Sequence, residues 1–329
     1  MNPPERSPTV SLVMPVLNEA HMLEGCLSAL CAQDYPAIIE IVVADGGSSD
    51  ATRQIAEAVP AVKVVENPRK SRPAGLNVAI AHASGEVIVR VDARTRLAPD
   101  YVTCCVAALQ QSEAALVGGP MRFESHNARQ RGIAAAMMSR LGAGPAEFRR
   151  LGGPPRFVDT VYLGAYRREV IEALGGYDEW SGGNEDAELA FRAQASGGVY
   201  LDPRIHSSYI VREGLVPLSR QFYRYGRNRA RTIRKHPRAL SLRQLAVPAL
   251  FAGLISPFRL FVLAAYACLV LGRGAGEAVR DPAAAPTLMA ALPTMHLCWG
   301  VGFLRGIVSS VPSRPDELTV LREPARKVS

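Results

Sequence analysis

The stretch Ile38-Ile-Glu-Ile-Val-Val-Ala-Asp-Gly-Gly-Ser-Ser-Asp50 joins a short apolar run to a turn of glycines, hydroxyls and acids. Such a run, bounded by turn residues, is typical of a buried strand. Two more runs end in the same way. The first ends in Met14-Pro-Val-Leu-Asn-Glu19, and the second, residues 86–91, ends in Asp92-Ala-Arg94. Each run brings a carboxylate or an amide to the carboxyl end of a strand, where open α/β sheets bind ligands.

Helical segments alternate with these strands, which predicts an α/β fold with a parallel sheet. We expect strands at residues 9–16, 38–45, 62–66, 86–92, 115–123 and 160–166. We expect helices at residues 19–32, 50–59, 73–83, 99–111 and 184–195. Asn184 is a residue type that often caps the start of a helix.

The acids beside the glycines and hydroxyls indicate the kind of ligand. Together they suit a base edge, a ribose and a metal-bound pyrophosphate, which are the parts of a nucleotide-sugar. No Gly-x-Gly-x-x-Gly follows the first strand, so a dinucleotide fingerprint is excluded.

Four motifs in this order resemble the family 2 inverting glycosyltransferases, which have the GT-A fold. The family pattern is P-x-x-N-E, D-G-S-x-D, D-x-D and G-x-x-E-D, and it corresponds here to residues 15–19, 45–50, 92–94 and 182–186. The resemblance covers roughly residues 8–235. The runs at 90–94 and 221–227 are similar to those of the ExoA-like subgroup, which makes exopolysaccharide of the succinoglycan type. The resemblance implies a mixed sheet flanked by helices, and inverting transfer of a hexosyl group from a nucleotide-diphosphate sugar.

The resemblance places the donor around the first two motifs. Asp45 is expected at a uracil-type base and Glu19 near the ribose, while Pro15 and Asn18 shape the same pocket. Without the resemblance, the turn that begins at Asp45 also fits a simple turn followed by a helix cap.

The family has further donor contacts in the stretch that corresponds to residues 67–77. Arg72 and Asn77 are the candidates there. A solvated loop fits this stretch equally well.

Asp92 begins the equivalent of D-x-D, whose acids handle the ribose and a divalent cation in the family. Oxygen ligands suit Mg²⁺ or Mn²⁺. The third position is Arg94, which departs from the pattern. Two accounts stay open: Asp92 holds the ion together with His206, or Arg94 supplies a fixed cation beside the pyrophosphate.

Asp186 is the predicted catalytic base. It follows a glycine-containing segment at the start of a predicted helix, where a carboxylate could take the proton of the acceptor hydroxyl. Glu185 and Trp180 are predicted to bind the acceptor. The Gly-, Pro- and Arg-rich stretch 141–157 is predicted to be a loop near the same acceptor.

Gln221 and Arg224 correspond to the Q-x-x-R-W motif of processive relatives and are predicted to bind phosphate. Tyr225 replaces the tryptophan, which argues against a polymer-extruding synthase. These side chains could contact the diphosphate, lipid phosphates or both.

The positive charge of the chain is concentrated in one segment. The whole chain of 329 residues has a formal net charge of +8, and residues 220–243 contain nine Lys or Arg residues and no acid. No nucleic-acid-binding fold surrounds this patch, so a nucleic-acid partner is not expected. The six cysteines show no zinc spacing and predict buried free thiols in a reducing compartment.

Beyond the basic segment the chain becomes apolar. The stretches 245–271 and 283–308 are each long enough for a membrane helix, but prolines and arginines interrupt both. Spanning, interfacial and buried helices therefore stay open. We divide the chain into a catalytic domain (1–215), a basic interfacial helix (216–243) and a membrane-associated region (244–329).

These predictions describe a bacterial inverting glycosyltransferase at the inner membrane, with its catalytic domain in the cytoplasm. It would use a divalent cation to move one sugar from a UDP-sugar to a lipid-linked saccharide during exopolysaccharide or cell-envelope glycan synthesis. Two alternatives stay open: transfer to polyprenyl phosphate, and a non-catalytic subunit that binds nucleotide-sugar.

Overall fold

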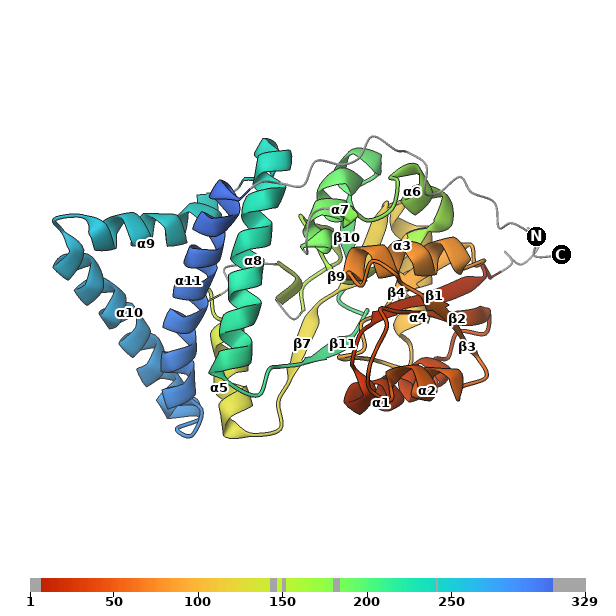
Figure 1. The fold of residues 1–329 in the computed structure, drawn as a ribbon, viewed down its shortest axis with the longest axis horizontal. Helices are drawn as coiled ribbons and strands as arrows, with labels where there is room; N and C mark the ends of the chain where they lie inside the picture. Colours follow the sequence, from red (N-terminus) through yellow and green to blue (C-terminus); the bar gives the residue numbers. More distant parts are fainter. Residues whose placement is uncertain (1–6, 143–146, 150–151, 180–183, 241, 310–329) are drawn as a thin grey trace.

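A sheet of eight strands forms the centre of the α/β part and has helices on both faces (Figure 1). The computed structural model describes residues 7–142, 147–149, 152–179, 184–240 and 242–309. In spatial order the strands are β3 (Val62–Glu66), β2 (Ile38–Asp45), β1 (Val10–Val16), β4 (Val87–Arg90), β9 (Tyr162–Arg167), β6 (Leu116–Gly119), β10 (Val199–Leu201) and β8 (Arg156–Phe157).

The sheet is mixed, as the family resemblance implied. Strand β1 pairs in parallel with β2 and β4, but β9 runs antiparallel between β4 and β6. A fully parallel sheet was therefore a wrong expectation. The predicted strand at 115–123 breaks at Pro120, because proline cannot donate to a strand ladder. Its second half, β7 (Met121–Glu124), joins a three-stranded sheet with β5 (Thr95–Leu97) and β11 (Ser207–Ile210).

Two apolar cores fix the helices to the faces of the main sheet. Leu23, Leu27 and Tyr101 belong to the core on one face, and Leu76 and Leu189 to the core on the other. The first core holds α1 (Ala20–Cys31), α2 (Thr52–Glu57) and α4 (Tyr101–Ser112). The second core holds α3 (Arg72–His82), α6 (Arg168–Ala173) and α7 (Glu185–Ala193).

The C-terminal helices form a third packed unit. It consists of α8 (Leu215–Lys235), α9 (Ala246–Ile255), α10 (Arg259–Arg280) and α11 (Ala285–Val308), together with α5 (Ala128–Met138). Short 3₁₀ turns lie at Glu147–Arg149, Gln194–Ser196, Pro237–Ala239 and Leu242–Leu245. Ile133 of α5, Phe222 of α8 and Met295 of α11 share one core, so the α/β part and the C-terminal helices are packed together.

Helices α8 and α11 approach each other closely through glycines. A Cβ atom at Gly302 would clash with the backbone oxygen of Tyr223, and one at Gly226 would clash with that of Trp299. Two helices, α10 and α11, are long and apolar enough to cross a membrane. Helix α10 is mostly exposed, whereas α11 has nearly half of its apolar stretch buried inside the protein.

The apolar stretch 245–271, which prolines were expected to interrupt, divides into α9 and part of α10: α9 ends before Ser256 and Pro257, since a residue before proline disfavours the helical conformation. Two local predictions were wrong. Asn184 does not cap α7 with its side chain, which instead donates to Thr232 Oγ1. All six cysteines are free, but Cys31 and Cys268 are exposed.

Candidate active site

The neighbouring positions of β1, β2 and β4 bring the first three motifs together. The three strands are parallel, so their carboxyl ends lie at one edge of the sheet. Asn18, Asp45 and Asp92 follow or end these strands. The sequence prediction that these polar residues meet at one edge is confirmed by the strand order.

A network of hydrogen bonds holds the loop after β2. The buried Asp45 accepts from Ser48 N and Ser48 Oγ, at 3.1 Å and 2.5 Å. Asn18, whose φ is +53°, accepts from Ser49 N at 2.8 Å, and its own N donates to Ser48 Oγ. The loop that follows Pro15 and the loop that follows Asp45 therefore form one rigid wall.

Arg90, the last residue of β4, is fully buried at the centre of the site. Its guanidinium lies 3.2 Å from Asp92 Oδ1 and 3.2 Å from Glu185 Oε1, and it also contacts the carboxylate of Asp186. The guanidinium lies 5.5 Å from the centre of the Tyr177 ring. These partners offset the cost of burying the charge.

Two arginines keep Asp92 ionised. Burial favours the protonated form of Asp92, but the charges of Arg90 and Arg72 outweigh burial and lower the pKa of Asp92. Arg72 lies at the start of α3, is about half exposed, and approaches Glu185 Oε1 to 3.6 Å. Asp92 and Glu185 in turn raise the pKa of Arg72. Asp92 is thus held as a carboxylate by its two arginine neighbours.

The two acids at the start of α7 face different environments. The side chain of Asp186 is 36% exposed, whereas that of Glu185 is 3% exposed. The predicted contact of Glu185 with the acceptor is therefore not supported, because its carboxylate is turned inward to Arg90. Asp186 is open to solvent and is the better placed of the two to meet a hydroxyl group. Trp180, the other predicted acceptor residue, lies outside the described residues.

Arg94 is engaged by a neighbouring acid. Its guanidinium lies 3.0 Å from Glu19 Oε2, and it also contacts His21 Nε2 at 3.3 Å. This ion pair joins Glu19, which was expected near the ribose, to Arg94, which replaces the second acid of D-x-D. The positive charge of Arg94 is thus balanced by Glu19 before any ligand binds.

The structure does not bring the two predicted metal ligands together. Strands β5 and β11 are antiparallel. The backbone carbonyl of His206 accepts a hydrogen bond from the N–H of Ala98, the residue that follows the carboxyl end of β5. Asp92 precedes the opposite end of β5, so His206 and Asp92 lie at opposite ends of this ladder. Within the described ranges, no three His, Cys, Asp or Glu side chains gather as a metal site. Of the two predicted ligands, Asp92 alone suits an ion whose other ligands would be phosphate oxygens and water.

Asn77 holds the segment that leads to the predicted catalytic base. Its Oδ1 accepts from Tyr177 N at 2.8 Å, and its Nδ2 donates to Tyr177 O and Glu179 Oε1, both at 2.9 Å. Arg69 also contacts the carboxylate of Glu179. These contacts join the 67–77 stretch to residues 177–179. The stretch is therefore packed against the site and is not simply a solvated loop.

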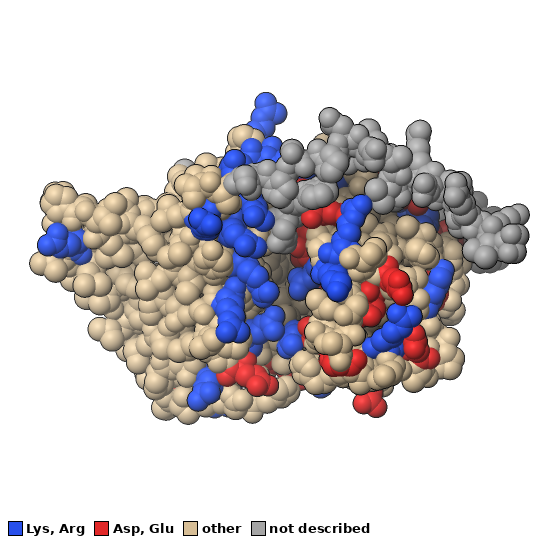
Figure 2. Space-filling model, in the orientation of Figure 1, with Lys and Arg blue, Asp and Glu red and all other residues tan. Residues whose placement is uncertain are grey.

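Basic side chains of α8 border a hollow between this helix and the α/β part (Figure 2). Burial and the neighbouring charges of Arg212 and Arg72 lower the pKa of Arg224. The buried Gln221 donates to the Tyr225 hydroxyl at 2.7 Å, and its Oε1 has no hydrogen-bond partner among the residues that the structure describes. Three arginines with mutually repelling charges form a site that favours an anion.

Sequence reasoning missed Arg90 and Arg212 as site residues. A signal for Arg90 was present, because a charged residue inside an apolar strand run needs a partner when it is buried. No comparable signal marks Arg212, whose position depends on how α8 packs.

Comparison with known proteins defines the class. The pattern of the family described as Glycosyl transferase family 2 matches residues 11–175. The chain belongs to this family and is a glycosyltransferase with the GT-A fold. It is 32% identical to the succinoglycan biosynthesis protein ExoA of Rhizobium meliloti (strain 1021), over 94% of this chain and 98% of that protein. The predicted ExoA-like subgroup is thereby confirmed.

A second relative shares about half of the chain. The undecaprenyl-phosphate 4-deoxy-4-formamido-L-arabinose transferase of Klebsiella pneumoniae subsp. pneumoniae is 28% identical over 173 residues, 50% of each protein.

Solved structures show the same fold. The mannosyltransferase PcManGT from Pyrobaculum calidifontis, in complex with GDP-Man and Mn²⁺, has a TM-score of 0.61 at 22% identity, covering 92% of this chain and 88% of that one. S. aureus TarS 1–349, in complex with UDP-GlcNAc, has a TM-score of 0.56 at 17% identity, covering 90% and 91%. At these identities the similarity concerns the fold alone.

Proposed function

We propose that this glycosyltransferase moves a hexosyl group from a UDP-sugar to a lipid-linked saccharide, with inversion, in the synthesis of a bacterial exopolysaccharide or cell-envelope glycan. The observation that carries the proposal is the buried Arg90, which joins Asp92 to Asp186. Arg90 thereby holds Asp92, on the proposed donor side, and Asp186, on the proposed acceptor side, in a single cluster.

The donor would lie along the edge formed by β1, β2 and β4. In this proposal Asp45 binds the base, while Pro15 and Asn18 form the wall of the pocket. Glu19 lies near the ribose and shares its carboxylate with Arg94. The UDP diphosphate extends toward Arg72 and Arg212, whose charges it neutralises. Gln221 contributes its amide to this diphosphate, whereas Arg224, one turn further along α8, is assigned to the phosphates of the lipid-linked acceptor.

A divalent cation, Mg²⁺ or Mn²⁺, is part of the proposal. Asp92 would hold it, with the remaining ligands coming from the diphosphate and water. The bound ion would neutralise charge on the diphosphate. The structure of PcManGT with GDP-Man and Mn²⁺ supports cation use in this fold.

Asp186 would act as the general base. Its carboxylate takes the proton of the acceptor hydroxyl while that oxygen forms a bond to the anomeric carbon. The bond from that carbon to the UDP oxygen breaks on the opposite face, which inverts the configuration. The guanidinium of Arg90 contacts the carboxylate of Asp186 and holds it in place.

The acceptor and the location rest on relatives and on the exposed apolar helices. The Klebsiella relative is an undecaprenyl-phosphate transferase, and ExoA acts in succinoglycan biosynthesis. Ile255, Phe258 and Phe261, near the junction of α9 and α10, are each more than two-thirds exposed. We propose that these side chains enter the inner membrane while the catalytic domain stays in the cytoplasm.

The test is a panel of UDP- and GDP-sugars, each supplied with a lipid extract from the source bacterium and analysed by mass spectrometry. We expect one UDP-sugar to add a single hexosyl mass to a lipid-linked saccharide. A second candidate acceptor, polyprenyl phosphate, is favoured by the Klebsiella relative, and a product containing only phosphate, lipid and one sugar would identify it. Transfer from GDP-sugars alone would overturn the proposed donor.

A further inference from the structure

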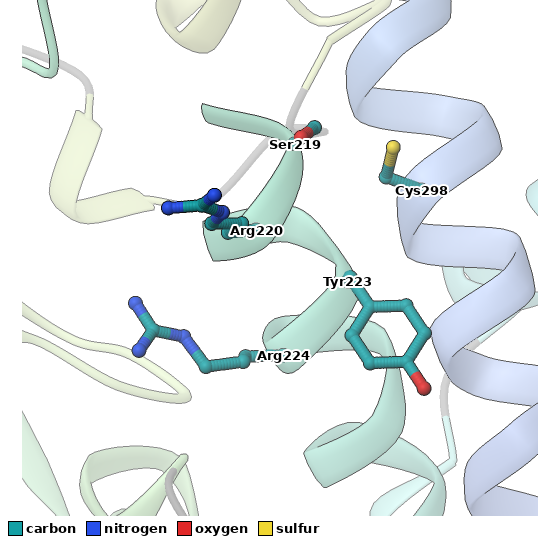
Figure 3. A pocket seen from close by; sticks show the side chains of 5 residues that line it. All are labelled: Ser219, Arg220, Tyr223, Arg224 and Cys298. Atoms are coloured by element: carbon teal, nitrogen blue, oxygen red, sulfur yellow. The ribbon is translucent and has the colours of Figure 1, made fainter. Parts of the chain in front are cut away.

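A groove of about 490 Å³ lies where the basic helix α8 meets the apolar helix α11. Its lining residues are Ser219, Arg220, Tyr223, Arg224 and Cys298. In Figure 3 the guanidinium groups of Arg220 and Arg224 extend on the same side of α8, away from α11. Tyr223 and Cys298 lie on the side where the two helices meet. The groove thus combines a cationic wall with a more apolar one.

The two arginines are one helical turn apart and carry uncompensated charge. Neither Arg220 nor Arg224 forms an ion pair with an acid in the part of the chain that the structure describes. Arg212 and Arg72 add further positive charge next to Arg224. An anion with several oxygens, such as a diphosphate, would relieve this repulsion and accept paired N–H groups.

The apolar side of the groove continues along α11. Four apolar side chains of α11 are each about half exposed or more: Leu297, Val301, Leu304 and Val308. Their spacing of four, three and four residues places them on one face of the helix. Cys298 lies at the edge of this face, between it and the face that packs on α8. A hydrocarbon chain leaving the groove would therefore meet a continuous apolar track.

The cationic side of the groove leads to the catalytic centre. The charge of Arg72 acts on Arg224 and lowers its pKa, and the Arg72 guanidinium lies 3.6 Å from the carboxylate of Glu185, the residue before Asp186. A diphosphate held at Arg220 and Arg224 would therefore have its attached saccharide on the side of the predicted base.

We infer that this groove binds the polyprenyl diphosphate part of the acceptor, with phosphates at Arg220 and Arg224 and the first isoprene units against Tyr223 and Cys298. The inference rests on the proposed function, because it names the site of that acceptor. It commits to the acceptor lipid and not to bilayer phospholipid, because the charges of Arg72 and Arg212 act on Arg224 and Arg72 in turn approaches Glu185 beside the predicted base.

The test uses full-length protein in neutral detergent micelles and farnesyl diphosphate as the probe. Alkylation of Cys298 by a maleimide is followed by peptide mass spectrometry, with the exposed Cys31 on α1 as the internal reference. We expect farnesyl diphosphate to slow alkylation of Cys298 and leave that of Cys31 unchanged. Inorganic pyrophosphate and phosphatidylglycerol at equal concentration should protect Cys298 much less.

Two variants make the test specific. Arg220→Glu should raise the farnesyl diphosphate concentration needed for half-maximal protection of Cys298 about tenfold or more. The change replaces a charge-assisted hydrogen bond by repulsion. Arg238→Glu changes an exposed arginine of the same basic segment and should behave as wild type. Both variants should retain UDP binding, which checks that they are folded.

The outcomes separate the groove from the proposed function. Absence of protection, equal protection in Arg220→Glu, or equal protection by pyrophosphate or phosphatidylglycerol would overturn the inference. Protection with the expected variant pattern, but without sugar transfer from any donor, would uphold the lipid site and reject the proposed reaction.

Discussion

Arg90 Nη2 lies 3.2 Å from Glu185 Oε1, and both side chains are buried although the residues are 95 positions apart in the sequence. Arg90 ends the strand that leads to Asp92, and Glu185 begins the helix that carries Asp186. The pair therefore locks the two halves of the site to each other. A shift of α7 would leave buried charges without partners, which is costly.

Replacing Arg90 should both disable the site and destabilise the fold. We expect Arg90→Met to lower kcat by about 10² or more, since Asp186 loses its positioning partner. Removing one partner of buried charges should also cost about 3–5 kcal/mol of unfolding free energy. Arg90→Lys should recover part of both. Steady-state kinetics and thermal unfolding measure the two effects.

The double variant Arg90→Met/Glu185→Gln separates the effect on turnover from the effect on stability. It removes one cation and one buried anion, so thermal stability should return toward that of wild type while kcat stays low. Restoration of full turnover in the double variant would contradict the positioning role of Arg90.

Asp186→Asn should abolish transfer and leave nucleotide binding nearly intact. Loss of a general base typically lowers the rate by about 10²–10⁴. Asp178→Asn is the matched control, because Asp178 lies within the Asn77-held segment 177–179 but pairs with Lys235 at 2.8 Å. We expect near wild-type turnover for this control. Turnover of Asp186→Asn at the wild-type level would refute the assignment.

The dependence on a divalent cation should reside in Asp92 and not in His206. Asp92→Asn should raise the Mn²⁺ concentration for half-maximal activity by at least about tenfold. His206→Ala should leave this concentration unchanged, because His206 lies at the far end of the β5–β11 ladder. The measurement is activity against Mn²⁺ after chelation. Full activity in excess chelator would show that no divalent ion is required.

Glu188 should make a stability contribution that depends on pH. It is fully buried on α7 and contacts Arg192 at 2.7 Å, with Lys235 and His236 at the end of α8. Burial raises its pKa, but the hydrogen bonds and charge of Arg192 and the charge of Lys235 outweigh burial and lower it. A lowered folded pKa means that the stabilisation is complete above the unfolded value of about 4.3 and is lost as the pH falls through the folded value.

Glu188→Gln should therefore lower the free energy of unfolding by about 3–5 kcal/mol at pH 7, and the gap from wild type should narrow as the pH falls below the unfolded value of about 4.3. Glu172→Gln removes an exposed pair with Arg168 and should change stability by less than about 1 kcal/mol. Thermal unfolding from pH 3 to pH 8 measures both variants. A gap that does not narrow in acid would show that the charge of Glu188 is not what stabilises the α7–α8 contact.

Gly302→Ala should separate α8 from α11. The added methyl group would overlap the backbone oxygen of Tyr223, which cannot move without shifting the helix, so we expect a loss of about 2 kcal/mol or more. A methyl group added by Gly272→Ala on α10 meets no described atom within 4 Å, so this change should be neutral or slightly stabilising. Detergent-solubilised thermal unfolding compares the two. Equal Tm values would contradict the close packing of these helices.

The sequence by itself determined the local features of this protein. Apolar runs that end in Asn18, Asp45 and Asp92 predicted strands with polar ends, because strand formation and turn chemistry depend on near neighbours. The order of the motifs predicted the α/β class and the glycosyltransferase family. The change from the basic segment 220–243 to apolar stretches marked the C-terminal helices.

Only the tertiary structure decided how distant segments meet. The antiparallel insertion of β9 between β4 and β6 does not follow from any local pattern. Arg90 reaches Asp186 because α7 and β4 contribute to one core, and Arg94 meets Glu19 because β1 adjoins β4. The ladder that separates His206 from Asp92 depends on pairing between remote strands. Such contacts arise from the packing of whole elements, so they depend on topology and not on the residues next to them in sequence.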